Sequence, residues 1–245
     1  ALIPAILTLS IFTALNAIVT VGFNTNLHDV IYNVIQMPLV GLGSSIWATL
    51  IAIFFIQFLW FFGLHGQILV NSVMDPIWNT LMYDNLDAYK AGEHIPHIIS
   101  KPFMETFTVG LGGSGMTLAV VILMAFVMKK RQYRDVGRLA LGAGIFNVNE
   151  PVIFGLPIVL NATILIPWVI SPIIVTALNY FVMAIGLVPA PTGVSVPWTV
   201  PVFFSGMIAT NSLAGGLPQI VDCLIVGFIW YPFLRMLDKQ PDSAL

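Results

Sequence analysis

The amino-acid sequence predicts an all-α polytopic integral membrane protein, and three observations support that prediction. Of the 245 residues, 58% are hydrophobic and only 8% are charged, whereas soluble domains carry roughly 25% charged residues. The mean hydropathy is +0.95. Apolar runs close to the length of about 20 residues that a membrane-spanning helix requires recur along the chain.

The first apolar run, residues 1–21, predicts a membrane-spanning helix. Residues 22–37 are polar enough to form a loop or an interfacial amphipathic helix, and residues 39–63 form a second strong span. Ala1 enters the apolar run directly, without an initiator Met or a basic signal-peptide region. We therefore expect the chain to be part of a longer protein.

The middle of the chain is more polar. Residues 67–82 form a shorter segment that carries Asn71 and Asp75, and we expect it to be re-entrant or interfacial. Residues 83–102 are the most polar stretch and predict a surface loop with partial helical structure. Residues 103–128 predict another span. Its first half contains Gly110, Gly112, Gly113 and Gly115, which we expect to permit close helix contact.

Two interrupted segments distinguish the last third of the chain. Residues 139–161 contain several Gly, Asn and Pro residues and predict two half-helices that meet at a polar tip. A long span at residues 162–188 is followed by four prolines within residues 189–201, then by a shorter segment and a final span at 217–234. Paired interruptions in apolar sequence indicate a binding site built from broken helices near the membrane midplane. The predicted fold is thus a helical bundle with two broken or re-entrant hairpins.

Glu150 is the most informative residue of the first break. Between Leu139 and Leu234 there is no Lys, Arg or His, and the only carboxylates are Glu150 and Asp222. An ionisable group at such depth usually faces a cavity or a partner. Pro151 removes a backbone donor and disfavours α geometry at the residue before it. The pattern favours a polar-substrate site, with a structural carboxylate bonded to free backbone N–H groups as the alternative.

Charge placement predicts the orientation. Five of the nine basic residues lie within residues 129–138, and Arg235 and Lys239 lie near the end of the chain. Basic residues concentrate in cytoplasmic loops, so we expect both segments on the cytoplasmic side. Cys223 is the only cysteine, which excludes a disulfide framework or a cysteine-rich metal site within this sequence.

The sequence Asn-Val-Asn-Glu-Pro-Val-Ile-Phe-Gly-Leu-Pro at residues 147–157 resembles the signature of the membrane component, IIC, of the bacterial phosphoenolpyruvate-dependent sugar phosphotransferase system. It is most similar to the lactose/cellobiose/diacetylchitobiose branch. Supporting matches are the segment 60–66, which ends in Gly-Leu-His-Gly, the sequence Pro-Trp-Thr at 197–199 and the segment 231–240. The resemblance covers nearly the whole chain but only the C-terminal part of a IIC domain, so the N-terminal helices of the family are absent.

The resemblance implies a fold of the EIIC glucose-superfamily type in a multi-pass protein of the bacterial plasma (inner) membrane. Residues 1–38 would be the first transmembrane helix with an interfacial or linker segment, and residues 39–240 the substrate-binding part. It implies a disaccharide substrate, of the cellobiose or diacetylchitobiose type or lactose. It also implies a phosphorylated IIB partner supplied by IIA, and a homodimer in the full-length protein. No cofactor and no nucleic acid is expected.

The same resemblance assigns roles to individual residues. Glu150 would hydrogen-bond the reacting sugar hydroxyl and accept its proton, with His65 as the second catalytic residue. Trp198 would lie against the sugar, and Asn147 and Asn149 would bond its hydroxyls. The alternatives are an interfacial His for His65, membrane-interface anchoring for Trp198 and half-helix capping for the asparagines.

Two further interpretations remain open. His94, His97 and Glu93 could suggest a metal, but their polar loop favours solvated side chains, and we expect no metal. A cation-coupled secondary sugar transporter, with Glu150 as the ion or proton site, is the alternative function, because broken helices also occur in that class.

Overall fold

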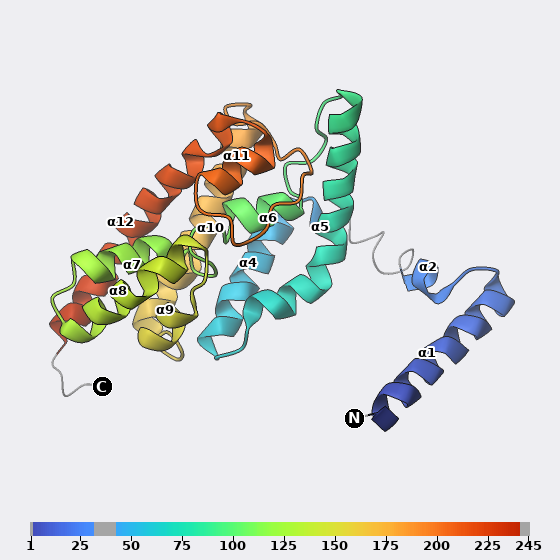
Figure 1. The fold of residues 1–245 in the computed structure, drawn as a ribbon, viewed down its shortest axis with the longest axis horizontal. Helices are drawn as coiled ribbons and strands as arrows, with labels where there is room; N and C mark the ends of the chain where they lie inside the picture. The colour runs from blue at the N-terminus through green and yellow to red at the C-terminus, as the bar shows by residue number, and fades with distance from the viewer. Residues whose placement is uncertain (1, 32–42, 241–245) are drawn as a thin grey trace. The chain divides into compact units, whose positions relative to one another are not determined.

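The computed structural model describes residues 2–31 and 43–240, and every regular element within these ranges is helical (Figure 1). The all-α prediction is therefore confirmed for the described residues. Three helical segments are long and apolar enough to cross a membrane: Ile6–Phe23, Ala162–Ala184 and Leu213–Lys239. The chain divides into two compact units, residues 1–42 and 43–245, which are described separately.

The first unit contains α1 (Leu2–Phe23) and the short α2 (Leu27–Ile31). Asn16 Oδ1 accepts a hydrogen bond from the Leu27 N–H at 2.8 Å, which ties the start of α2 to α1. The predicted helix over residues 1–21 is present. The later part of the predicted segment 22–37 lies outside the described residues.

The second unit opens with α4 (Ile46–Phe61), whose N-cap Ser45 accepts from the Trp47 N–H through its hydroxyl. The first residues of the predicted span 39–63 lie outside the described residues. Helix α5 (Gly66–Ala91) then runs without interruption through the predicted boundary at residue 82. Residues 83–91 are thus the helical part of the predicted, partly helical surface loop, and residues 93–100 are irregular. The polar stretch contains no strong helix breaker before Gly92, which ends the helix in the left-handed conformation.

The prediction of one continuous span over residues 103–128 is wrong. It is divided into α6 (Lys101–Phe107) and α7 (Thr117–Phe126), with irregular backbone between them. Gly112, Gly113 and Gly115 have φ values of +94°, +82° and +77°, a backbone region that residues other than Gly rarely occupy. The glycines therefore form a third interruption of the apolar sequence rather than a close helix contact.

The two predicted breaks are present. Helix α8 (Arg131–Ile145) and the short α9 (Glu150–Gly155) flank a non-helical tip. After α10 (Ala162–Ala184) the backbone is irregular up to α11 (Phe204–Thr210), as the prolines predict. Residues 213–215 form a 3-10 turn, and α12 (Leu217–Lys239) completes the described chain.

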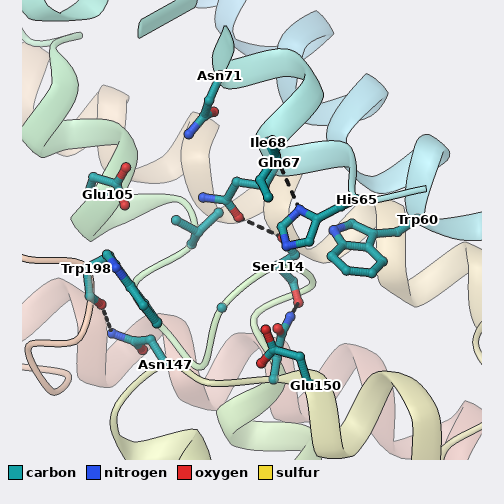
Figure 2. Close-up of a pocket in the computed structure, with 13 residues that line it drawn as sticks. Trp60, His65, Gln67, Ile68, Asn71, Glu105, Ser114, Asn147, Glu150 and Trp198 are labelled. Carbon is teal, nitrogen blue, oxygen red and sulfur yellow. Dashed lines mark hydrogen bonds between the residues drawn. The ribbon is translucent and has the colours of Figure 1, made fainter. Parts of the chain in front are cut away.

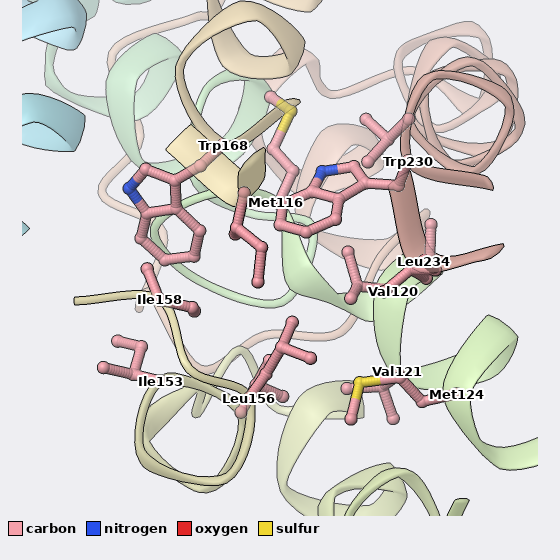
Figure 3. Close-up of a cluster of buried hydrophobic side chains, with 14 of the residues drawn as sticks. Met116, Val120, Val121, Met124, Ile153, Leu156, Ile158, Trp168, Trp230 and Leu234 are labelled. Carbon is pink, nitrogen blue, oxygen red and sulfur yellow. The ribbon is translucent and has the colours of Figure 1, made fainter. Parts of the chain in front are cut away.

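A buried apolar cluster joins α7, α9, α10 and α12 (Figure 3). The rings of Trp168 and Trp230 meet edge to face with centroids 6.4 Å apart, an arrangement that aromatic pairs favour. Met116, at the end of the glycine-rich loop, is fully buried beside them. The loop is thereby packed against the same core that holds the helices.

Asp238 fixes the basic segment to the end of α12. Its carboxylate accepts from the Lys129 N–H at 3.0 Å and from the Lys130 N–H at 2.8 Å. The basic residues that follow, and Arg235 and Lys239 on the last turns of α12, consequently lie at the same end of this unit. This arrangement agrees with the expectation that both segments face one side of a membrane.

The packing of the glycine-rich loop gives a first prediction. A Cβ at Gly115 would overlap the Trp168 ring, and its φ is positive, whereas a Cβ at Gly142 on α8 meets no atom within 4 Å. Gly115→Ala should destabilise the protein by about 1–3 kcal/mol through overpacking. Gly142→Ala should be neutral or stabilising by up to about 1 kcal/mol.

Thermal unfolding in detergent measures both variants. A clear drop of the midpoint for Gly115→Ala alone is expected. Equal midpoints for the two variants would contradict the packing described for this loop.

Candidate functional site

A cavity of about 320 Å³ lies where the three interruptions meet α5 (Figure 2). This volume is at the lower end of the range of about 300–1,000 Å³ that ligand sites occupy. The lining combines two tryptophans with carboxylates, amides and a histidine: Trp60, His65, Gln67, Ile68, Asn71, Glu105, Val109, Gly113, Ser114, Asn147, Asn149, Glu150 and Trp198.

Asn147 joins all three interruptions. Its Oδ1 accepts from the Gly112 N–H at 2.7 Å, and its Nδ2 donates to the carbonyl oxygens of Trp198 and Val200 at 2.7 and 3.0 Å. Its backbone is left-handed, with φ of +64°, a conformation that Asn tolerates better than most residues. Only 4% of the residue is exposed, so these buried hydrogen bonds of its amide hold the three loops together.

Asn149 extends the same network towards α5. Its Nδ2 donates to the Ser114 carbonyl at 2.8 Å, and the Ser114 hydroxyl donates to Gln67 Oε1 at 2.7 Å. A Cβ at Gly113 would overlap both Asn147 and Asn149. The absence of a side chain at this position allows the glycine-rich loop to approach the tip this closely.

Glu150 is the first residue of α9 and directly follows the tip that Asn147 and Asn149 hold in place. It is exposed and lines the cavity, and Figure 2 shows it below Ser114 and His65 in the same cavity. An ionised carboxylate only accepts hydrogen bonds. In this position it can receive a hydroxyl proton or hydrogen bond from a ligand in the cavity.

His65 lines the same cavity as the N-cap of α5. Its Nδ1 accepts from the Ile68 N–H at 3.3 Å, and its ring centroid lies 4.5 Å from that of Trp60. Because Nδ1 is an acceptor, the proton of the neutral ring is on Nε2. His65 can thus donate through Nε2 where Glu150 can accept.

Trp198 forms another wall of the cavity, with 54% of its surface exposed and its indole turned inward (Figure 2). Its position is set by its own backbone carbonyl, which accepts from Asn147. An exposed indole face at a cavity offers apolar area with a fixed orientation.

The structure therefore brings all five residues singled out from the sequence to one cavity. It also adds residues that sequence reasoning missed, among them Gln67, Asn71 and Glu105. Gln67 and Asn71 are spaced i, i+4 just after His65, so their shared helix face was a usable signal. Glu105 is a carboxylate within the predicted span 103–128, which is a signal of the same kind as that used for Glu150.

The two loop histidines lie apart from this site. His97 Nε2 is 3.3 Å from the Asp84 carboxylate. Within the described ranges there is no group of three or more His, Cys, Asp or Glu side chains placed to hold a metal ion.

Comparison with known proteins assigns the family. Residues 1–172 match the model of the family described as phosphotransferase system, EIIC. The oligo-beta-mannoside-specific EIIC component of Bacillus subtilis (strain 168) is 63% identical over 239 residues. The chain belongs to the EIIC family. The resemblance stated from residues 147–157 is thereby confirmed.

Further EIIC proteins match nearly the whole of this chain. The lichenan permease IIC component of Bacillus subtilis (strain 168) is 40% identical. Its match covers 98% of this chain and 53% of its own length, and the match of the oligo-beta-mannoside component covers 98% of this chain and 54% of its own length. The crystal structure of ChbC, the IIC component of an N,N'-diacetylchitobiose-specific phosphotransferase system, aligns with a TM-score of 0.85 at 38% identity. That alignment covers 98% of this chain and 55% of ChbC. The chain spans about half the length of the relatives it matches.

The bonds of Asn147 give a second prediction. Asn147→Asp keeps the acceptor for Gly112 but replaces the two donated bonds by a carboxylate beside two carbonyl oxygens. Buried groups left unpaired cost about 1–3 kcal/mol each, so the melting midpoint of the complete EIIC protein should fall.

Asn161→Asp is the matched control, because Asn161 Oδ1 only accepts, from the Thr163 and Ile164 N–H groups at the start of α10. Asp is an equally good N-cap. If the two substitutions lowered the melting midpoint equally in a thermal melt, Asn147 would not hold the three loops together as described here.

Proposed function

We propose that this chain forms the sugar-binding part of a phosphotransferase-system permease, which carries a β-linked disaccharide inward for phosphorylation by a IIB partner. The observation that carries the proposal is the convergence of Glu150, His65 and Trp198 on one cavity at the meeting point of the broken helices. Membership of the EIIC family supports it.

The chemistry of the site suits phosphorylation of a sugar hydroxyl. The phosphoryl group would leave a cysteine sulfur of IIB and form a bond to the sugar oxygen, while Glu150 accepts the proton that this oxygen loses. His65 Nε2 would donate a hydrogen bond to the same region and orient the sugar. Trp198 would support a sugar ring through apolar contact.

The substrate specificities of similar proteins support the proposed substrate class. Relatives are described as specific for oligo-beta-mannosides, lichenan or cellobiose, and the structural neighbour belongs to a diacetylchitobiose system. At 63% identity the oligo-beta-mannoside component adds β-mannosides to the sugars that the sequence suggested. We therefore propose β-linked hexose disaccharides, with β-mannosides and cellobiose to be tested first.

The remaining parts of the system are part of the same proposal. Residues 39–240 would be the substrate-binding part and residues 1–38 the helix and linker that lead into it. Additional N-terminal helices would supply most of the contact of a homodimer. IIA would phosphorylate IIB, and the basic segment 129–138 would face the cytoplasm of a bacterium, where IIB docks.

A cation-coupled secondary transporter is the second candidate, since Glu150 at a helix break also suits ion coupling. The chemical form of the accumulated sugar separates the two. Phosphorylated sugar inside the cell supports the phosphotransferase permease, whereas unmodified sugar supports ion coupling.

Glu150→Gln gives a third prediction. Gln keeps the shape and one acceptor oxygen but cannot take a proton. Loss of a hydrogen bond to a charged group costs about 1.5–3 kcal/mol, so sugar affinity in the complete transporter should fall by about ten- to a hundredfold. If Glu150 is also the base, phosphotransfer at saturating sugar should fall by a further factor of about 10²–10⁴.

Equilibrium binding and transfer from phosphorylated IIB measure the two effects separately. Glu93→Gln, in the exposed turn after α5, is the control and should leave both unchanged. Normal phosphotransfer by Glu150→Gln at saturating sugar would exclude the base role.

A further inference from the structure

A second cavity of about 170 Å³ adjoins the first. Its lining includes Met82, Lys101, Glu105, Ser195, Pro197 and Trp198. Glu105 and Trp198 line both cavities, so these two side chains form the boundary between the two spaces. None of the residues predicted from the sequence, apart from Trp198, belongs to this second space.

An ion-pair network fixes the junction. Lys101 Nζ lies 2.6 Å from Asp75 Oδ1 on α5 and 2.7 Å from Glu105 Oε1, one turn along α6. The Lys101 and Glu105 side chains are only 20% and 13% exposed, so the pairs are largely shielded from water and hold their geometry better than surface pairs do. The network thereby places a carboxylate at the boundary between the two cavities.

The junction lies opposite the reactive end of the first cavity. In Figure 2, Glu105 and Trp198 stand on one side and His65 and Glu150 on the other. A ligand whose hydroxyl is held by Glu150 would therefore extend towards Glu105 and Trp198. A longer ligand of the same kind would continue past them into the second cavity.

We propose that the second cavity binds the third sugar unit of a β-linked trisaccharide whose first two units occupy the cavity with Glu150. This inference rests on the proposed function, in which that cavity holds a disaccharide. The second cavity has about half the volume of the first, which matches one sugar unit beside two.

The side chains of the second cavity suit a sugar ring. The Lys101 ammonium has three donors, of which the described contacts with Asp75 and Glu105 use two, so one remains for a hydroxyl. The Ser195 hydroxyl can donate and accept, and Pro197 and Trp198 supply apolar surface. Charged, polar and apolar groups around one small space are typical of sites that fix a ligand's orientation.

The test compares a trisaccharide with a disaccharide in the complete transporter, using β-1,4-mannotriose and β-1,4-mannobiose. Ser195 is exposed, so Ser195→Trp can fill the second cavity without displacing a buried side chain. The variant should weaken mannotriose binding by about tenfold or more, equivalent to about 1.4 kcal/mol, and leave mannobiose binding within about twofold. Ser195→Ala is the matched control, since it keeps the space open.

The wild-type protein provides the second measurement. Mannotriose should displace labelled mannobiose completely, with an affinity at least equal to that of mannobiose. Failure to displace it, or equal effects of Ser195→Trp on the two sugars, would overturn the inference. Absence of mannobiose binding to the wild-type protein would instead count against the proposed function, so the two failures are distinguishable.

Discussion

The side-chain amide of Asn147 is the interaction on which the site depends. With one acceptor and two donors it joins the glycine-rich loop at Gly112 to the carbonyls of Trp198 and Val200. Irregular backbone in an apolar environment needs internal partners for its polar groups, since lipid offers none. The three interruptions of this chain satisfy one another through Asn147, and Asn149 continues the network to Ser114.

This arrangement links the backbone to the chemistry. Glu150 begins a helix directly after the fastened tip, Trp198 lies on the loop that Asn147 holds, and His65 caps the helix whose Gln67 accepts from Ser114. Each functional side chain comes from a different element, yet the positions of these elements are set by one connected network. Rigid support of this kind is what placing a reacting group within hydrogen-bond reach requires.

The sequence was most informative where a single strong signal overrode helix periodicity. Pro151 beside Glu150 and the prolines of residues 189–201 located two breaks, because proline cannot continue a helix ladder. The third break was missed because glycine is compatible both with helix contact and with positive φ, and only the packing of Gly115 against Trp168 selects the second. The role of Glu105 could not be predicted, since it depends on Lys101 and Asp75 across a helix boundary that the sequence did not reveal.

The most direct test of the account is a structure of the complete transporter with a β-linked disaccharide bound. In that complex a sugar hydroxyl should lie within hydrogen-bond distance, about 2.6–3.2 Å, of the Glu150 carboxylate, with His65 Nε2 beside it and a sugar ring against Trp198. The Asn147 bonds to Gly112, Trp198 and Val200 should be intact in that complex. A sugar bound elsewhere, with Glu150 turned away from it, would contradict the central claim.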